Sequence, residues 1–562
     1  MTVKPSHSSE SATGGAPTVP AARAAAPAGD GADPASASRK FLARATLVTA
    51  SLSIAGSVLG LVRDQALARL FGAGSDTDAF LVAWTVPEFA ATLLIEDGLA
   101  LVLIPAFSMA LARRARGAAG EPVRALVAAT LPRLCLALAA VAALVAAVAP
   151  YLVRALAPGL PEPRLAADCT RLTATCVLTF GLAGYCSAAL RAHRRFLAPA
   201  AIYVAYNTGI VAAMFLFGGS WGVRSAAVGV AAGGCLMVAV QVPSLWRQLT
   251  SRTQAPRGTG ADTEERPMQL ALIAAVLLFA LVRQSQVLVE RFLASGLPAG
   301  AISHLNYAQK VAQIPMTMSL MLCTVTFPVV ARALADGDTE RARTRVQRDL
   351  ALASGLVLLG MCVVISCAPQ LTELLFQRGA FTGEDTAATA GVMRVYALGL
   401  LGQTLVGALV RSYFSAGRPS WYPVGAMTVG ITVTSWMGAA TVGAWGVTGI
   451  AAANALGITV TAALLLAGLG TGRRTGPQSL SLRIRQVLAE LSRPVRAAVV
   501  ATVAGAFVAG RPDSPVAGLV AGCLTVTVVF VPLTVALGAQ GHASALRSAR
   551  TLTRKLTHGR FR

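Results

Sequence analysis

Long apolar runs, which recur from residue 43 to residue 537, constrain this chain more than any other feature. Each run is about 20 residues long, the length that an α-helix needs to cross the hydrocarbon core of a bilayer. The runs lack the two-residue alternation of strands, and only helices or closed barrels satisfy their backbone in lipid. Charged residues make up 13% of the chain, against about 25% in a soluble domain. The sequence therefore predicts an all-α polytopic membrane protein.

About fourteen membrane spans are predicted. They lie near 43–68, 79–111, 125–153, 168–190, 198–218, 223–245, 269–294, 302–333, 349–375, 387–414, 420–441, 446–469, 494–510 and 515–538. The predicted parts are a disordered cytoplasmic tail (1–38), a first lobe (39–246), a cytoplasmic linker (247–267), a second lobe (268–470), a second linker (471–493), a terminal pair of spans (494–538) and a basic cytoplasmic tail (539–562). The first tail is rich in Ala, Pro, Gly and Ser and lacks the apolar region of a signal peptide.

Arginine residues concentrate in alternate loops, and the formal net charge is +23. If the N-terminus is cytoplasmic, the inside loops hold the clusters at 113–124, 191–195, 247–266, 332–348 and 473–496. Positively charged loops stay on the cytoplasmic side, so we expect both termini to be cytoplasmic. The excess charge is expected to face anionic lipid, not nucleic acid.

An internal repeat relates the two halves of the chain. AFLVAWTVP ending at Pro87 and IPAFSMALA from Ile104 resemble NYAQKVAQIP ending at Pro315 and FPVVARALA from Phe327. An even number of spans separates equivalent positions, so both copies have the same orientation. The sequence therefore predicts two parallel six-helix lobes, with the last two spans outside the repeat. Two such lobes around a central cavity are typical of an alternating-access carrier.

The segment from Ser57 to Pro105 carries charged residues within apolar sequence. A charge at the bilayer centre costs about 2.5–3.5 kcal/mol on insertion scales, so these residues should face a cavity or the protein interior. Arg63 is predicted to bind an anionic headgroup, because guanidinium pairs bidentately with phosphate. The alternative is that Arg63 and Asp64 snorkel to an interface or form a structural pair.

Three acids in the same segment are the candidates for lining the cavity or coupling to a cation. Asp78 follows Gly74 and Ser75, and the favoured interpretation is an N-cap of its own helix. Glu96 and Asp97 are adjacent in an apolar run; the alternative for them is a structural partnership with Arg63. Pro87 and Pro105 are expected to kink this span.

The second lobe has candidates of its own. Gln286 and Glu290 are four residues apart and share a helix face, and Glu290 joins the candidate coupling acids. Lys310 and Arg411 are the cations predicted to bind substrate there. For Arg411, an interfacial anchor at the cytoplasmic side is the alternative.

Nine cysteines are scattered without a paired motif, and five histidines form no cluster, so neither a disulfide framework nor a metal site is expected. The sequence has no phosphate-binding loop and no nucleophile elbow. We therefore expect neither an enzyme nor an ATP-driven pump, and no cofactor. A membrane potential or an ion gradient would supply the driving force.

Three segments carry a resemblance to a known family: VLGLVRDQALARLFGAGSDTDAFLVAW from Val58, FLASGLPAGAISHLNYAQKVAQIP at 292–315, and LLFQRGAFTGEDTAATAGVMRVYALGL at 374–400. They resemble the MurJ/MviN family of lipid II flippases in the MOP exporter superfamily, over roughly 43–470. The resemblance implies flipping of an undecaprenyl-pyrophosphate-linked peptidoglycan precursor to the outer leaflet of a bacterial plasma membrane. It also implies a terminal helix pair that holds the polyprenyl tail, and cell-wall synthesis proteins as partners.

The chain departs from the family pattern in its cations. The family's Arg-Asp pair matches Arg63 and Asp64, and its DAF aspartate matches Asp78. The segment that reads P-N-x-x-R-R in the family reads PEFAAT from Pro87, and YADR reads YAQK at 307–310. A further family arginine is replaced by Ser57. Glu290 matches the acid of the family's sodium site, but its usual Asn partner in span 11 is not evident, which argues against sodium.

The preferred function is a flippase for lipid II or a similar precursor, with Arg63 and Lys310 on the diphosphate. Each charge-assisted contact contributes about 1.5–3 kcal/mol, so a cavity with fewer arginines holds a diphosphate less firmly. Two alternatives therefore stay open. One is an exporter of the same superfamily with another lipid-linked glycan, a drug or a metabolite as cargo. The other is a non-transporting scaffold of envelope synthesis.

Overall fold

The computed structural model describes residues 34–96, 98–116, 121–250, 270–321, 338–414, 420–470 and 484–538. The chain divides into a unit of residues 1–47 and a unit of residues 48–562, and the site lies wholly in the second. The described residues form helices joined by short turns, with no strand among them, so the predicted all-α fold is confirmed. The predicted tail at 1–38 lies mostly outside the described residues.

The helices of the predicted first lobe follow its expected spans closely. They are α1 (Pro34–Phe71), α2 (Ser75–Ala83), α3 (Thr85–Ala90), the π-helix η1 (Ala91–Glu96), α4 (Gly98–Ala115), α5 (Pro122–Leu156), α6 (Pro163–Ala192), α7 (Leu197–Trp221) and α8 (Arg224–Thr250). Among them α6 is the central element, because it packs against α2, α3, η1, α4, α5, α7 and α8.

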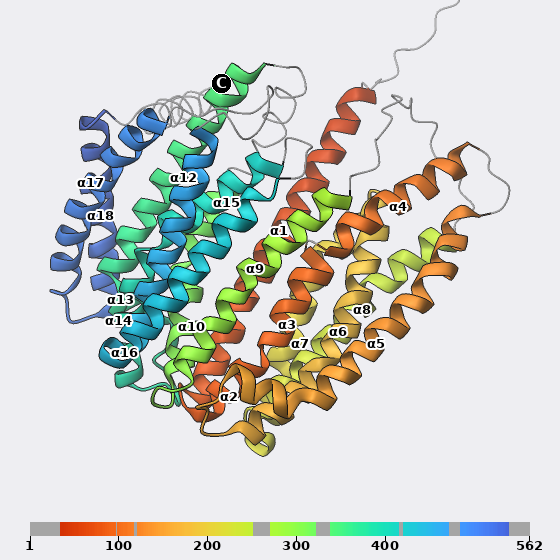
Figure 1. The fold of residues 1–562 in the computed structure, drawn as a ribbon, viewed down its shortest axis with the longest axis horizontal. Helices are drawn as coiled ribbons and strands as arrows, with labels where there is room; N and C mark the ends of the chain where they lie inside the picture. The colour runs from red at the N-terminus through yellow and green to blue at the C-terminus, as the bar shows by residue number, and fades with distance from the viewer. Residues whose placement is uncertain are drawn as a thin grey trace, which may run out of the picture. The chain divides into compact units, whose positions relative to one another are not determined.

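The second half is also helical. Its helices are α9 (Leu270–Ala294), α10 (Ala301–Ala312), α12 (Thr339–Ser366), α13 (Ala368–Phe376), α14 (Gly383–Ala397), α15 (Leu400–Phe414), α16 (Tyr422–Gly470), α17 (Ile484–Ala509) and α18 (Pro515–Ala536). Residues 314–321 are also helical. Helices α17 and α18 lie side by side and pack on α12 (Figure 1).

Within the described residues, ten helices are long and apolar enough to cross a membrane, or eleven if α14 and α15 form one span bent by 47°. One of the ten, α16, has 49 residues and breaks at Gly446, where φ is 54°. At about 1.5 Å per residue, α16 is too long for one crossing, so it fits the two spans predicted at 420–441 and 446–469. The total of fourteen stays a prediction, because the span predicted at 302–333 lies partly outside the described residues.

The predicted second span is broken, and one of its breaks lies one turn before Pro87, one of the two prolines expected to kink it. One break is at Trp84, between α2 and α3, and the other is the π-helical stretch η1. Pro87 lies in the first turn of α3, where a missing N–H is tolerated, and Pro105 lies within α4. A Cβ on Gly184 of α6 would collide with the Leu94 carbonyl of η1, so the glycine permits this close approach.

Contacts between the two halves involve a small set of elements. Helices α2, α3, α5 and η1 of the first half contact α9 and α10 of the second. Helix α2 is buried from Thr77 to Ala83. Its polar residues in this range, Thr77 and Asp78, are therefore enclosed by protein. The charged residues of the candidate site lie on or beside these elements.

Candidate functional site

Arg63 on α1 is held by three neighbours, all from the first half of the chain. Its Nη2 lies 2.7 Å from Asp64 Oδ1, and its Nη1 donates to Asn207 Oδ1 at 3.2 Å. Its Cζ lies 4.5 Å from the centroid of the Trp84 ring. The counter-ion is therefore the neighbouring residue in the chain. The alternative that made Glu96 the partner of Arg63 is wrong.

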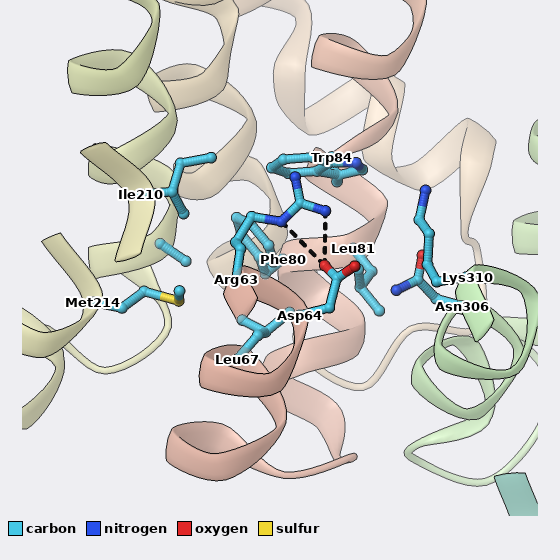
Figure 2. A pocket seen from close by; sticks show the side chains of 11 residues that line it. Arg63, Asp64, Leu67, Phe80, Leu81, Trp84, Ile210, Met214, Asn306 and Lys310 are labelled. Carbon is cyan, nitrogen blue, oxygen red and sulfur yellow. Dashed lines mark hydrogen bonds and ion pairs between the residues drawn. The ribbon is translucent and has the colours of Figure 1, made fainter. Parts of the chain in front are cut away.

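Arg63 and Lys310 line one pocket, although they come from different halves of the chain. Figure 2 shows the Arg63–Asp64 pair under Trp84 on one side and Lys310 with Asn306 on the other. The cavity has a volume of about 10 Å³, which is close to the minimum for a single water molecule. The structure thus brings the two predicted headgroup cations together, in a conformation with no room for a sugar diphosphate.

Glu88 on α3 bridges two cations of the second half. Its Oε2 lies 2.8 Å from Arg291 Nη2 on α9, and its Oε1 lies 3.6 Å from Lys310 Nζ on α10. Arg291 also donates to the hydroxyl of Thr85, and its side chain is 6% exposed. Sequence reasoning selected neither Glu88 nor Arg291 as a site residue. Both lie in apolar runs, but the two residues are 203 positions apart, so spacing within one helix could not predict their contact.

Asp78 does not cap its own helix, which corrects the favoured interpretation. The N-cap of α2 is Gly74, without a side-chain hydrogen bond. The Asp78 carboxylate instead accepts from the backbone N–H of Gly300 at 2.7 Å and of Ser303 at 2.8 Å, and from the Ser303 hydroxyl. It therefore caps α10, a helix of the other half, and does not line the Arg63 pocket.

Two more contacts join the halves beside Asp78. The N–H of Ala380 donates to the Arg69 carbonyl at 2.9 Å. The hydroxyl of Tyr307 lies 3.5 Å from the Gly72 carbonyl. Gly72 has a φ of 69°, and a Cβ there would press on the Ala380 carbonyl, so this turn requires glycine. The ends of α1 and α2 are thus fastened to α10 and to the turn that precedes α14.

Glu290 on α9 lies in a cage of amides. It accepts from Gln286 Nε2 at 3.2 Å, which confirms their predicted shared face, and also from Gln309 and Asn454. Glu290 is 3% exposed. Asn454 lies in the part of α16 that follows Gly446. The sequence analysis missed it because the family pattern places the Asn partner of Glu290 in an earlier span. The Oδ1 of Asn454 has no hydrogen-bond partner in the described part of the chain.

The other predicted residues lie elsewhere. Glu96 accepts from the Tyr203 hydroxyl at 3.0 Å and does not line the Arg63 pocket. Arg411 on α15 donates to the Leu320 carbonyl at 3.5 Å and is likewise absent from that pocket. Asp97 lies outside the described residues. In the described ranges, no group of three or more His, Cys, Asp or Glu side chains could hold a metal ion.

An apolar groove lies next to the Glu88 bridge. It has a volume of about 450 Å³ and is lined by residues of α3, η1, α5 and α6 and by Leu288 of α9. Among the described residues of its lining, the polar one is Thr85, whose hydroxyl contacts Arg291. Val141 on α5, which also lines it, is 46% exposed on the surface that would face lipid. Helix α3 therefore lines the groove and also carries Glu88 of the buried ion pairs.

Comparison with known proteins identifies the family of this chain. The family model described as "Lipid II flippase MurJ" matches residues 67–512. A lipid II flippase MurJ from Burkholderia cenocepacia is 27% identical over 387 residues, which cover 66% of this chain and 73% of that protein.

Two solved structures have the same fold. One, titled "Lipid II flippase MurJ, inward closed conformation", matches with a TM-score of 0.68 and 18% identity, over 87% of this chain and 98% of that chain. The other is an inward-facing multidrug resistance MATE family transporter of the MOP superfamily, with a TM-score of 0.59 and 15% identity, over 79% of this chain and 98% of that chain. Because the family model matches most of its length, this chain belongs to the lipid II flippase MurJ family.

Proposed function

We propose that this protein flips lipid II, or a similar undecaprenyl-pyrophosphate-linked peptidoglycan precursor, across the bacterial plasma membrane by alternating access. The observation that carries the proposal is the pocket shared by Arg63 and Lys310, one cation from each half of a MurJ-family chain. Cations inside a membrane protein mark a pathway for charged cargo. The activity is transport and not an enzymatic reaction.

The arrangement of the two cations suits a diphosphate. A guanidinium group pairs bidentately with one phosphate, while an ammonium group acts as a compact point charge for the other. Asp64, Asn207 and the Trp84 ring hold the Arg63 guanidinium in place before any cargo arrives. Less rotamer freedom is therefore lost when the headgroup binds.

The fastened end of the two halves supports alternating access. With both termini cytoplasmic, the contacts of Asp78, Tyr307 and Ala380 lie on the outer side of the membrane. The headgroup would then enter from the cytoplasmic side as the halves separate there. It would leave only after the outer contacts break. The cavity of about 10 Å³ corresponds to the state before entry.

A membrane potential or an ion gradient is the proposed driving force, with no bound cofactor. Glu290 is the best-placed acid for coupling, because it is buried and its partners are neutral amides. A group in such a place changes its hydrogen bonds when it gains or loses a proton or a cation. Glu96 accepts a tyrosine hydroxyl and is the weaker candidate.

The test is Arg63→Ala in cells that rely on this protein, with precursor exposure on the outer leaflet as the measurement. We expect exposure to fall to the level of cells depleted of the protein. Arg171→Ala is the matched control, since Arg171 is 50% exposed and pairs with Asp168 on the surface. If Arg63→Ala is expressed normally and the precursor is exposed on the outer leaflet as in wild type, Arg63 does not bind the headgroup.

Export of another amphipathic cargo is the second candidate. It is favoured by Ala91 and Thr92, which stand where the family pattern has arginines, and by the large apolar groove beside the bridge. Complementation of a strain depleted of its lipid II flippase separates the two functions. Rescue of growth by this chain would count against the second candidate, and failure at normal expression would favour it.

A further inference from the structure

We infer that Arg291 is a third headgroup-binding cation and that Glu88 is its internal counter-ion, which the diphosphate of the cargo displaces. The inference rests on the proposed function for the identity of the cargo. It goes further by naming the residue that keeps the second-half cations in place while the site is empty. It also names the contact that must break when cargo binds.

Beside the pocket, one carboxylate serves two cations, of which Lys310 lines the pocket. Asp64 is engaged by Arg63, and the donors to Glu290 among the described residues are side-chain amides. Within the described part of the chain, Glu88 is the carboxylate in contact with Arg291 and with Lys310. The three residues together carry one net positive charge. The two negative charges of a diphosphate diester would balance the two cations better than one carboxylate does.

Burial makes a counter-ion necessary for Arg291. Its side chain is 6% exposed, and a buried cation without a partner is strongly unfavourable. A guanidinium has five N–H donors, of which the structure engages one with Glu88 and one with Thr85. In the described ranges no acceptor is found for its other donors, which a larger anion could engage. Glu88 accepts from one N–H of Arg291, whereas a phosphate can accept from two in the bidentate geometry that guanidinium favours, so a phosphate in this place would engage Arg291 more fully.

Displacement of Glu88 would also change how the halves are connected. Glu88 belongs to α3, whereas Arg291 and Lys310 belong to α9 and α10. Exchange of the carboxylate for phosphate therefore breaks the ion pairs that run from the first half to the second. Headgroup binding and separation of the halves become one event. A structural salt bridge predicts the opposite, because its loss would weaken the site.

The experiment compares binding of undecaprenyl pyrophosphate to purified full-length protein and to Glu88→Gln, which keeps the shape of the side chain and removes its charge. We expect Glu88→Gln to bind about tenfold more tightly, because the competing anion is gone. Arg291→Gln should bind at least about tenfold more weakly. Glu490→Gln is the matched control, since Glu490 pairs with Arg493 on α17, away from the site.

The preference for two phosphates over one gives a second readout. Wild-type protein should prefer undecaprenyl pyrophosphate to undecaprenyl phosphate, and Arg291→Gln should lose most of that preference. If Glu88→Gln does not fold, Glu88→Asp keeps the charge but retracts it, and we expect an intermediate gain in affinity. Unchanged or weaker binding by folded Glu88 variants would overturn the displacement model.

Failure of this inference can be told apart from failure of the proposed function. If wild-type protein does not bind undecaprenyl pyrophosphate above an anionic phospholipid control, the proposed function fails. If wild-type protein binds it and the Glu88 variants show no gain, the proposed function stands. In that case Glu88 is a structural residue.

Discussion

The two sets of buried charges differ in where their counter-ions come from. Arg63 pairs with Asp64, the next residue on the same helix, and its other neighbours also belong to the first half. Arg291 and Lys310 pair with Glu88, which comes from the other half. If the halves separate, the first pair remains intact and the second does not. One site is therefore preformed, while the other depends on the conformational state.

The largest expected effect is on the preformed site. Arg63→Ala leaves Asp64 buried without its partner, and breaking a buried pair in this way costs about 3–5 kcal/mol of stability. Thermal unfolding of the purified protein measures the loss. Adding Asp64→Asn to the variant should restore part of it, because the stranded charge is then removed. A double variant no more stable than Arg63→Ala would contradict this description of the pair.

Arg291→Ala should cost less stability. Glu88 keeps Lys310 at 3.6 Å when Arg291 is removed, so the expected loss is about 1.5–3 kcal/mol, the range for one hydrogen bond to a charged group. The same unfolding measurement applies. A loss as large as that of Arg63→Ala would show that the two sites do not differ in the proposed way.

Asp78→Ala tests the contact between the halves without touching either cation. Removal of the carboxylate leaves the amides of Gly300 and Ser303 without their acceptor, at a cost of about 1–3 kcal/mol. Hydrogen exchange at these two amides should accelerate, since the start of α10 opens more often. Asp76→Ala is the control on the same helix. Equal exchange in the two variants would rule out Asp78 as the cap of α10.

The smallest expected effect concerns the aromatic ring above Arg63. Trp84→Leu keeps an apolar side chain but removes the cation–π contact, which contributes about 0.5–2 kcal/mol. Binding of undecaprenyl pyrophosphate should weaken by a corresponding factor, without loss of fold. Trp221→Leu is the control, since Trp221 is 51% exposed and stacks on Phe217. If both variants bind equally well, Trp84 only fills space.

The features that sequence reasoning found are local ones. The helices follow from apolar runs, and the Arg63–Asp64 pair and the Gln286–Glu290 contact follow from spacing along one helix. Lys310 was selected because a charge in an apolar run needs a cavity. Each of these inferences needs only a short window of sequence, and the structure places all five residues in polar clusters between helices.

The features that were missed depend on contacts between distant segments. Glu88 meets Arg291 only because α3 packs on α9, and Asp78 meets Gly300 only because α2 packs on α10. Asn454 reaches Glu290 across 164 positions of the chain. No periodicity within a single helix encodes such a meeting. The interpretation of Asp78 as a cap was right about its chemistry but assigned it to the wrong helix.

The way Asp78 joins the two halves has a consequence for the evolution of this chain. Two of its three partners are backbone amides, at Gly300 and Ser303, which every residue except proline provides. A substitution at Ser303 removes the hydroxyl donor but keeps the amide donor, and the φ of 94° at Gly300 favours glycine whatever residue stands at position 78. The side chains of the partners therefore put little pressure on position 78. Pairwise covariation among homologous sequences would therefore leave this contact almost invisible, although it joins the two halves of the molecule.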